Sequence, residues 1–269
     1  MSNRILYISQ EITPYLAANR MSTIGQKLPQ HAQENGYEVR IFMPKYGAIN
    51  ERRNQLHEVI RLSGLNVIID DTDHPLIIKV ATLQPSRMQV YFIDSDDYFI
   101  HKTINDLELN LYPAENDERM MFFAYGVIET VKKLRWEPRI VHCQGWVSSL
   151  APLYIKTLYA DDPTFKNARV ICSLYNDRFD GALDSRFIDK LAESGIPAEV
   201  VDKLKGKDIT YTDLMKLAID YSDAIAISSP EIPQELIDYA HASGKPVVEY
   251  PGSDDNFAPY VEAYNDMLK

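Results

Sequence analysis

The sequence has 269 residues, of which 45% are hydrophobic and 25% are charged, and its formal net charge at pH 7 is −11. This composition is typical of a globular protein, and the negative charge argues against nucleic acid and anionic membranes as partners. No apolar run approaches the roughly 20 residues needed to cross a bilayer, and no signal peptide is recognisable, so we expect a cytoplasmic protein. The two cysteines, Cys143 and Cys172, predict buried inert thiols rather than a disulfide framework.

The chain opens with an alternation of strand and helix. Residues 4–9 and 38–43 are short apolar runs typical of strands covered on both faces. Between them, residues 22–35 have a helical pattern that ends at Gly36. This β-α-β order predicts the start of a parallel sheet.

The next part of the chain changes character. Three β-rich runs lie too close together for helices between them, so we expect hairpins added to the sheet, at 65–69, 76–83 and 89–93. A long irregular segment is expected at 101–116. A strong helical pattern then runs over 117–135 and stops before Pro138.

Strands and helices alternate again in the second half. The expected strands are 139–143, 169–174, 224–227 and 246–249, and the expected helices are 146–158, two or three between 185 and 221, 231–242, and one from 257. The sequence therefore predicts one α/β domain over 1–269, with a Rossmann-like, mostly parallel sheet flanked by helices and an added β-hairpin region. We expect residues from about 230 to 269 to form a closing segment at the edge of the sheet.

Ligands of open parallel sheets bind at the carboxyl ends of the strands, so candidate residues are expected there. The segments that follow the predicted strands are 10–21, 144–146, 175–181 and 228–230. No C-x-x-C or H-x-x-x-H spacing occurs, and no phosphate-binding glycine motif is present. We therefore predict neither a metal site nor a bound cofactor.

An ordered set of short motifs resembles the glycogen/starch synthases, which transfer glucose from a nucleotide sugar to the end of an α-glucan. The family pattern S-E-x-x-P-x-x-K-T-G-G-L is matched at Glu11 and Pro14. Further similar stretches follow in family order at 28–29 (LP), 43–46 (MPKY), 90–99 (VYFIDSDDYF), 115–123 (ENDERMMFF), 138–146 (PRIVHCQGW), 173–181 (SLYNDRFDG) and 227–230 (ISSP). The resemblance implies one half of a two-domain GT-B-type glycosyltransferase, with the C-terminal nucleotide-binding domain absent.

The chain departs from this family at positions that carry chemistry. The family's K-T-G-G, implied to meet the sugar-nucleotide phosphate, reads Ala17-Ala18-Asn19-Arg20 here. In the family pattern H-x-H-D-W, the second histidine and the aspartate are replaced by Gln144 and Gly145. The histidine of the family's H-N motif becomes Tyr175. Because glutamine is not a base near neutral pH, we assign no catalytic residue, and Gln144 and Tyr175 occupy the family's catalytic positions.

Ten residues are candidates for a ligand cleft: Glu11, Asn19, Arg20, His142, Gln144, Trp146, Tyr175, Asn176, Asp177 and Gly181. Structural roles compete with binding at several of them. His142 is the more typical of a hydrogen-bonded core histidine, and Trp146 of helix packing. Glu11 is equally suited to capping backbone donors, and an asparagine at a strand end often supports the turn.

Three functions are consistent with these features. The first is a glycan-binding or regulatory half-domain of a synthase, inactive alone, with an α-glucan or another sugar as its partner. The second is an active glycosyltransferase that uses ADP-glucose as donor and is completed by a separate C-terminal subunit or by homodimerisation. The third is a protein–protein scaffold that uses the face which a second domain would cover.

Overall fold

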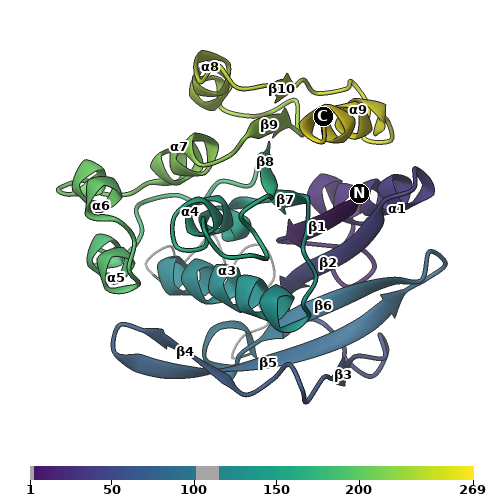
Figure 1. Ribbon diagram of the computed structural model, residues 1–269, viewed down its shortest axis with the longest axis horizontal. Helices are drawn as coiled ribbons and strands as arrows, with labels where there is room; N and C mark the ends of the chain where they lie inside the picture. Colours follow the sequence, from purple (N-terminus) through teal and green to yellow (C-terminus); the bar gives the residue numbers. More distant parts are fainter. Residues whose placement is uncertain (1–2, 101–114) are drawn as a thin grey trace.

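The computed structural model describes residues 3–100 and 115–269 (Figure 1). A ten-stranded sheet runs through this part of the chain in the order β10-β9-β8-β7-β1-β2-β6-β5-β3, with β4 paired to β5. The segment expected to be irregular at 101–116 falls, except for its last two residues, outside the described residues. The predicted fold class, a mostly parallel sheet with an antiparallel hairpin region, is confirmed.

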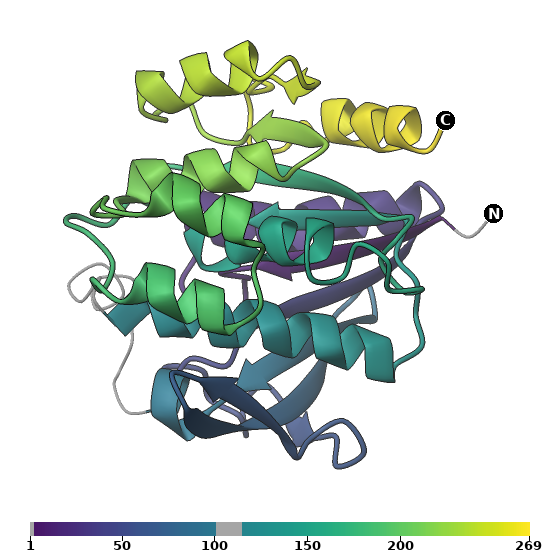
Figure 2. The same ribbon diagram turned by 60° about the vertical axis from the view of Figure 1, so that its left-hand side comes forward.

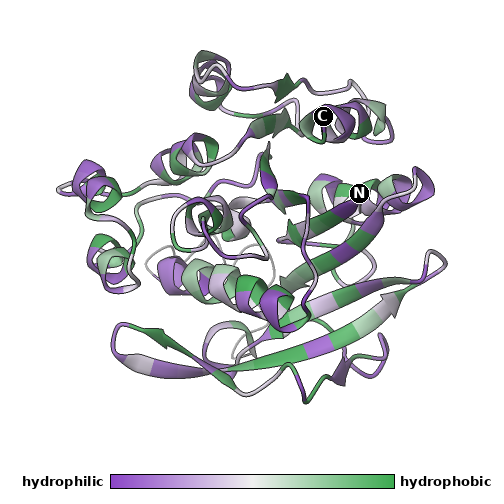
Figure 3. Ribbon diagram, viewed as in Figure 1, coloured by the Kyte–Doolittle hydropathy of each residue, from purple (hydrophilic) through white to green (hydrophobic). Residues whose placement is uncertain are grey.

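Seven strands are parallel and build the centre of the sheet. They are β1 (Arg4–Ser9), β2 (Glu38–Pro44), β6 (Met88–Asp94), β7 (Ile140–Gln144), β8 (Arg169–Leu174), β9 (Ala224–Ile227) and β10 (Val247–Val248). Every residue of β7 and β9 is buried, as expected for strands covered by helices on both faces. Figure 3 shows the hydrophobic strands between helices with hydrophilic outer faces.

The antiparallel part consists of β3 (His57–Glu58), β4 (Leu65–Ile69) and β5 (Thr72–Leu83). Strand β5 begins earlier than the sequence predicts, and β3 is not predicted. The cause of the early start is a two-residue turn at Asp70 and Asp71, whose φ values of 50° and 59° suit a tight hairpin. The hairpin lets β5 pair with β4 immediately after the turn, even though Pro75 lies within the strand.

Helices cover both faces of the parallel strands (Figures 1 and 2). One face carries α3 (Asn116–Lys133), α4 (Leu150–Lys156) and α7 (Tyr211–Asp220). On this face, α4 packs against both α3 and α7. The opposite face carries α1 (Arg20–Glu34) and α9 (Ala258–Met267). The other helices of the described residues are α5 (Phe187–Glu193), α6 (Ala198–Leu204) and α8 (Gln234–Ala242), with a π-helical turn η1 (Asp96–Ile100) and a 3₁₀ turn η3 (Trp146–Ser148). The single helix predicted at 146–158 is thus a 3₁₀ turn followed by the shorter α4.

The two cysteines face each other across neighbouring strands, since Cys143 on β7 is the register partner of Cys172 on β8. Both are free and buried, and burial raises the pKa of each thiol above its ordinary value. The predicted burial of both thiols is confirmed. Among the described residues, none of the helices combines the length and apolar character that a bilayer crossing requires.

Candidate functional site

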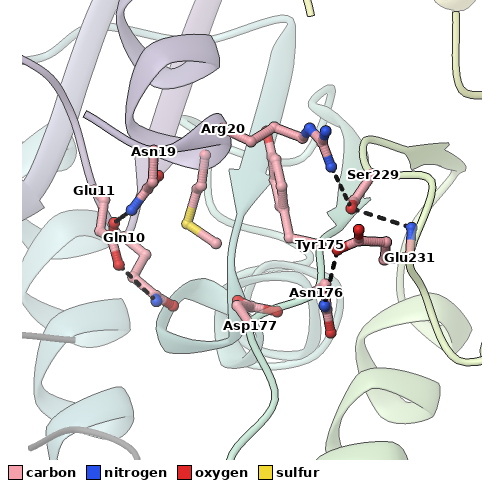
Figure 4. A pocket seen from close by; sticks show the side chains of 10 residues that line it. Gln10, Glu11, Asn19, Arg20, Tyr175, Asn176, Asp177, Ser229 and Glu231 are labelled. Atoms are coloured by element: carbon pink, nitrogen blue, oxygen red, sulfur yellow. Dashed lines mark hydrogen bonds between the residues drawn. The ribbon is translucent and has the colours of Figure 1, made fainter. Parts of the chain in front are cut away.

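A pocket of about 260 Å³ opens at the carboxyl ends of β1, β8 and β9 (Figure 4). Its walls come from the segment after β1, the first turn of α1, the segment after β8 and the segment after β9. The lining residues are Gln10, Glu11, Asn19, Arg20, Met21, Tyr175, Asn176, Asp177, Ser229 and Glu231. The sheet topology explains this convergence, because the carboxyl ends of parallel strands meet at one edge.

Six of the ten residues predicted for a ligand cleft line this pocket: Glu11, Asn19, Arg20, Tyr175, Asn176 and Asp177. The other four, His142, Gln144, Trp146 and Gly181, lie elsewhere. Four lining residues are not among the ten candidates: Gln10, Met21, Ser229 and Glu231. The first three lie in the predicted strand-end segments 10–21 and 228–230, and Glu231 lies one residue beyond the second of them.

The first turn of α1 is closed by its own cap. Asn19 has an extended backbone, with φ −135°, and its Oδ1 accepts a hydrogen bond from the Ser22 amide at 2.8 Å. In return, Ser22 Oγ accepts from the Asn19 amide at 2.9 Å, which completes a capping box. This cap starts the helix at Arg20, two residues earlier than the sequence pattern indicates. The Asn19 side-chain amide also donates to Glu11 Oε2, which orients that carboxylate at the pocket wall (Figure 4).

Asp177 is a carboxyl group of the pocket lining whose pKa is raised. Burial raises its pKa to about 6, although hydrogen bonds from the Trp146 amide and the Tyr211 hydroxyl act in the opposite direction. Trp146 N donates to Oδ2 at 2.9 Å and Tyr211 Oη donates to Oδ1 at 2.8 Å. The side chain is therefore fixed in orientation, and its charge changes within the physiological pH range.

His142 is not a ligand-cleft residue, which corrects that candidate. It is fully buried on β7, beneath α9, where Nδ1 lies 2.6 Å from the Tyr264 hydroxyl and Nε2 lies 2.6 Å from Ser173 Oγ. Burial lowers the pKa of His142 to about 3, so the imidazole is neutral at physiological pH. His142 is thus the hydrogen-bonded core histidine that the sequence analysis gave as the alternative to a ligand-cleft residue.

Gln144 and Trp146 are also core residues rather than cleft residues. Gln144 is buried at the end of β7, and its Oε1 accepts a hydrogen bond from Ser9 Oγ at 2.7 Å. The indole of Trp146 is fully buried and packs edge-on against Phe179, with ring centroids 5.1 Å apart. Stacking of this ring on a sugar is excluded because none of it is exposed.

Two glycines of the candidate motifs, Gly145 and Gly181, have positive φ angles, which glycine adopts more readily than other residues. Gly181 has φ 84° and is exposed beside the pocket segment, without lining the pocket. Gly145 has φ 84° and ψ 160°, a conformation that is open to glycine and strained for other residues. A Cβ atom at Gly145 would lie 2.7 Å from Oε1 and 2.8 Å from Cβ of Gln10. Gln10 therefore occupies the space that a side chain at position 145 would need.

No group of three or more histidine, cysteine, aspartate or glutamate side chains within residues 3–100 and 115–269 is arranged to hold a metal ion. The carboxylates of the pocket thus face it from separate strand ends rather than forming one chelating cluster. Hydrogen bonding to a ligand is the chemistry that the lining offers, through carboxylate, amide and hydroxyl groups.

The fold and the order of the motifs agree with a known family. Residues 4–245 match the family model described as the starch synthase catalytic domain. The chain belongs to this family. The match ends before β10, so β10, α9 and the segment between them lie beyond the residues that the family model matches.

Glycogen synthases are among the similar proteins. The chain is 34% identical over 236 residues to glycogen synthase of Chlorobaculum parvum and 33% identical to that of Chlorobium phaeovibrioides; each alignment covers 87% of this chain and 47% of the relative. The chain therefore spans about half the length of these relatives. A solved structure, the catalytic domain of starch synthase IV from Arabidopsis thaliana bound to ADP and acarbose, has a TM-score of 0.70 at 17% identity, covering 93% of this chain and 51% of that one.

Proposed function

We propose that this starch synthase-family chain binds the end of an α-glucan, or another uncharged sugar, in the strand-end pocket and does not transfer glucose by itself. It then acts as a glycan-binding or regulatory half of a synthase. The observation that carries the proposal is the pocket lining, in which nearly every wall residue offers a hydrogen-bonding group to sugar hydroxyls. Met21 and the Tyr175 ring add apolar surface of the kind that contacts the carbon face of a sugar.

Three features support the absence of transfer. Ala17 stands where the family pattern has the lysine that is implied to meet the phosphate, and alanine provides no charge. Gln144 is buried and bonded to Ser9, and an amide cannot act as a base. Burial raises the pKa of Tyr175 well above its ordinary value, so its hydroxyl does not release a proton near neutral pH.

The length of the relatives favours one other function. Because this chain spans 47% of the glycogen synthases that it resembles, a nucleotide-binding half supplied from outside residues 1–269 would complete an active glycosyltransferase. The similar starch synthase IV structure contains bound ADP. In the completed glycosyltransferase, ADP would be the nucleotide released when glucose is transferred from ADP-glucose.

One paired measurement tests the proposal. Purified chain is titrated with maltoheptaose by calorimetry, and the same preparation is assayed for transfer of labelled glucose from ADP-glucose, and in parallel from UDP-glucose, to glycogen. We expect binding of maltoheptaose without transfer above background. Transfer by the isolated chain would contradict the proposal, and a folded chain that binds no glucan would contradict the sugar-binding part. Transfer that appears only with a second polypeptide would favour the alternative.

The ionisation of Asp177 predicts a pH dependence for this binding. Above pH 6 the ionised carboxylate is the stronger acceptor for a sugar hydroxyl, and its two oxygens keep lone pairs beyond those used by Trp146 and Tyr211. We expect maltoheptaose affinity to fall roughly tenfold between pH 7.5 and pH 5, with a midpoint near pH 6. Asp177→Asn should bind more weakly at pH 7.5 and show no such midpoint. A midpoint that persists in the variant would assign the titration to another group.

A further inference from the structure

Arg20 is the single cationic side chain among the residues that line the pocket, and it is already bound within the chain. Its Nε donates to Asp254 Oδ1 at 2.9 Å, and its Nη1 donates to Ser229 Oγ at 3.0 Å (Figure 4 shows the second bond). An arginine held in this way offers fewer donors to an incoming ligand than a free guanidinium would.

The residue that holds Arg20 belongs to a short segment between β10 and α9, residues 249–257, which we call the strap. Within the strap, the Tyr250 hydroxyl donates to Asp254 Oδ1 at 3.0 Å, and the Arg20 guanidinium lies 5.8 Å from the centre of the Tyr250 ring. A second ion pair joins Asp255 to Lys27 of α1 at 2.5 Å. The strap therefore lies along the first turns of α1 and fixes the Asp254 carboxylate at the pocket rim.

The helix end beside Arg20 is partly capped. Free amides at a helix N-terminus attract phosphate, but one of them, the Ser22 amide, already donates to the Asn19 side chain. The guanidinium and one amide of the helix end are thus bound by groups of the chain itself. Carboxylates at Glu11, Asp177 and Glu231 add negative charge around the cavity.

We propose that Asp254 is a specificity-determining residue, which keeps phosphate-bearing ligands out of the sugar pocket by occupying Arg20. The inference rests on the proposed function of this pocket as a sugar site. A phosphorylated sugar would have to displace the Asp254 carboxylate from Arg20 against the charge of the pocket, whereas an uncharged sugar meets neither obstacle. Asp254 lies beyond residues 4–245, so the carboxylate that binds Arg20 comes from a part of the chain that the family match does not include.

The test compares Asp254→Asn with Asp255→Asn, using maltotriose and glucose 1-phosphate as probes in calorimetric titrations at low salt. Both variants remove one negative charge from the same strap, but only the first removes the charge that holds Arg20, because Asp255 pairs with Lys27. We expect Asp254→Asn to bind glucose 1-phosphate about tenfold more tightly than the wild-type chain, with maltotriose affinity unchanged within about twofold. Asp255→Asn should leave both affinities as they are. Adding Arg20→Gln to Asp254→Asn should remove the gain.

Two results would overturn the inference: a wild-type chain that binds glucose 1-phosphate as tightly as maltotriose, or an equal gain in both single variants. Failure of the sugar-site proposal has a different signature, namely no maltotriose binding in any variant while Asp254→Asn still gains affinity for glucose 1-phosphate. Thermal unfolding of each sample shows whether the strap tolerates the change. If Asp254→Asn does not fold, Tyr250→Phe removes the hydroxyl that holds Asp254 and should give a smaller gain of the same kind; no gain there would overturn the inference.

Discussion

Replacing His142 with glutamine is expected to reduce the acid sensitivity of the fold. In the folded chain His142 has a pKa of about 3, far below the ordinary value of about 6.5. Below pH 6.5 the unfolded chain therefore takes up a proton at this residue that the folded chain does not, so the free energy of unfolding falls as the pH falls. The expected contribution is about 2 kcal/mol between pH 6.5 and pH 5, and His142→Gln should lack it.

The same replacement should lower stability at pH 7.5 by about 1–3 kcal/mol, because it disturbs a buried chain of hydrogen bonds. That chain connects strands β1, β7, β8 and β9 to helix α9, through Tyr7, Tyr264, His142, Ser173, Ser228 and Tyr260. Urea unfolding at a series of pH values from 7.5 to 5 measures both effects.

Tyr264→Phe is the matched control for this experiment. It removes the hydroxyl that bonds to both His142 and Tyr7 but leaves the histidine in place. We expect it to lose stability at every pH and to keep the steep fall below pH 6.5. Equal pH slopes in the wild-type chain and His142→Gln would show that another group causes the acid sensitivity.

Introducing a side chain at Gly145 is expected to destabilise the fold by roughly 2–5 kcal/mol. One part, about 1–3 kcal/mol, is the cost of holding a non-glycine residue at φ 84° and ψ 160°. The other part, of similar size, comes from overlap with Gln10, whose Oε1 and Cβ lie 2.7 Å and 2.8 Å from the position that the methyl group of an alanine would take. Chemical unfolding of Gly145→Ala measures the sum.

Two further variants separate the parts. Gly36 has φ 87° with no atom within 4 Å of an added Cβ, so Gly36→Ala should cost only the backbone strain, about 1–2 kcal/mol. Combining Gly145→Ala with Gln10→Ala should cost at least about 1 kcal/mol less than the sum of the single changes, because the truncation removes Oε1 and Cδ of Gln10 from the overlap and leaves only Cβ. Strict additivity would contradict the steric coupling of Gln10 and Gly145.

This coupling bears on any attempt to restore the synthase motifs. The family pattern has serine and aspartate at the positions of Gln10 and Gly145. Gly145→Asp alone would place its side chain against Gln10, whereas Gln10→Ser would remove the Oε1 and Cδ atoms of that contact. A variant designed to regain transfer by Gln144→His and Gly145→Asp therefore needs the change at Gln10 as well.

Most of the fold could be predicted from the sequence, since buried parallel strands are continuous apolar runs whose ends are marked by turn residues. Strands β1, β8 and β9 have the bounds that the sequence predicts. Two of the errors arose where local signals compete: the early start of β5 depends on the Asp70–Asp71 hairpin, and the short 3₁₀ turn before α4 has no distinct pattern.

The sequence by itself determined the family, the sheet and the edge at which the pocket lies, because strand ends and motif order are local properties of the chain. Only the tertiary structure decided which side chains face the pocket. His142 and Asp177 both belong to strand-end motifs, yet one is buried under Tyr264 and the other lines the cavity. Arg20 meets Asp254 across 234 positions of sequence. Such contacts depend on how α9 and the strap pack on the sheet, which no local pattern of residues specifies.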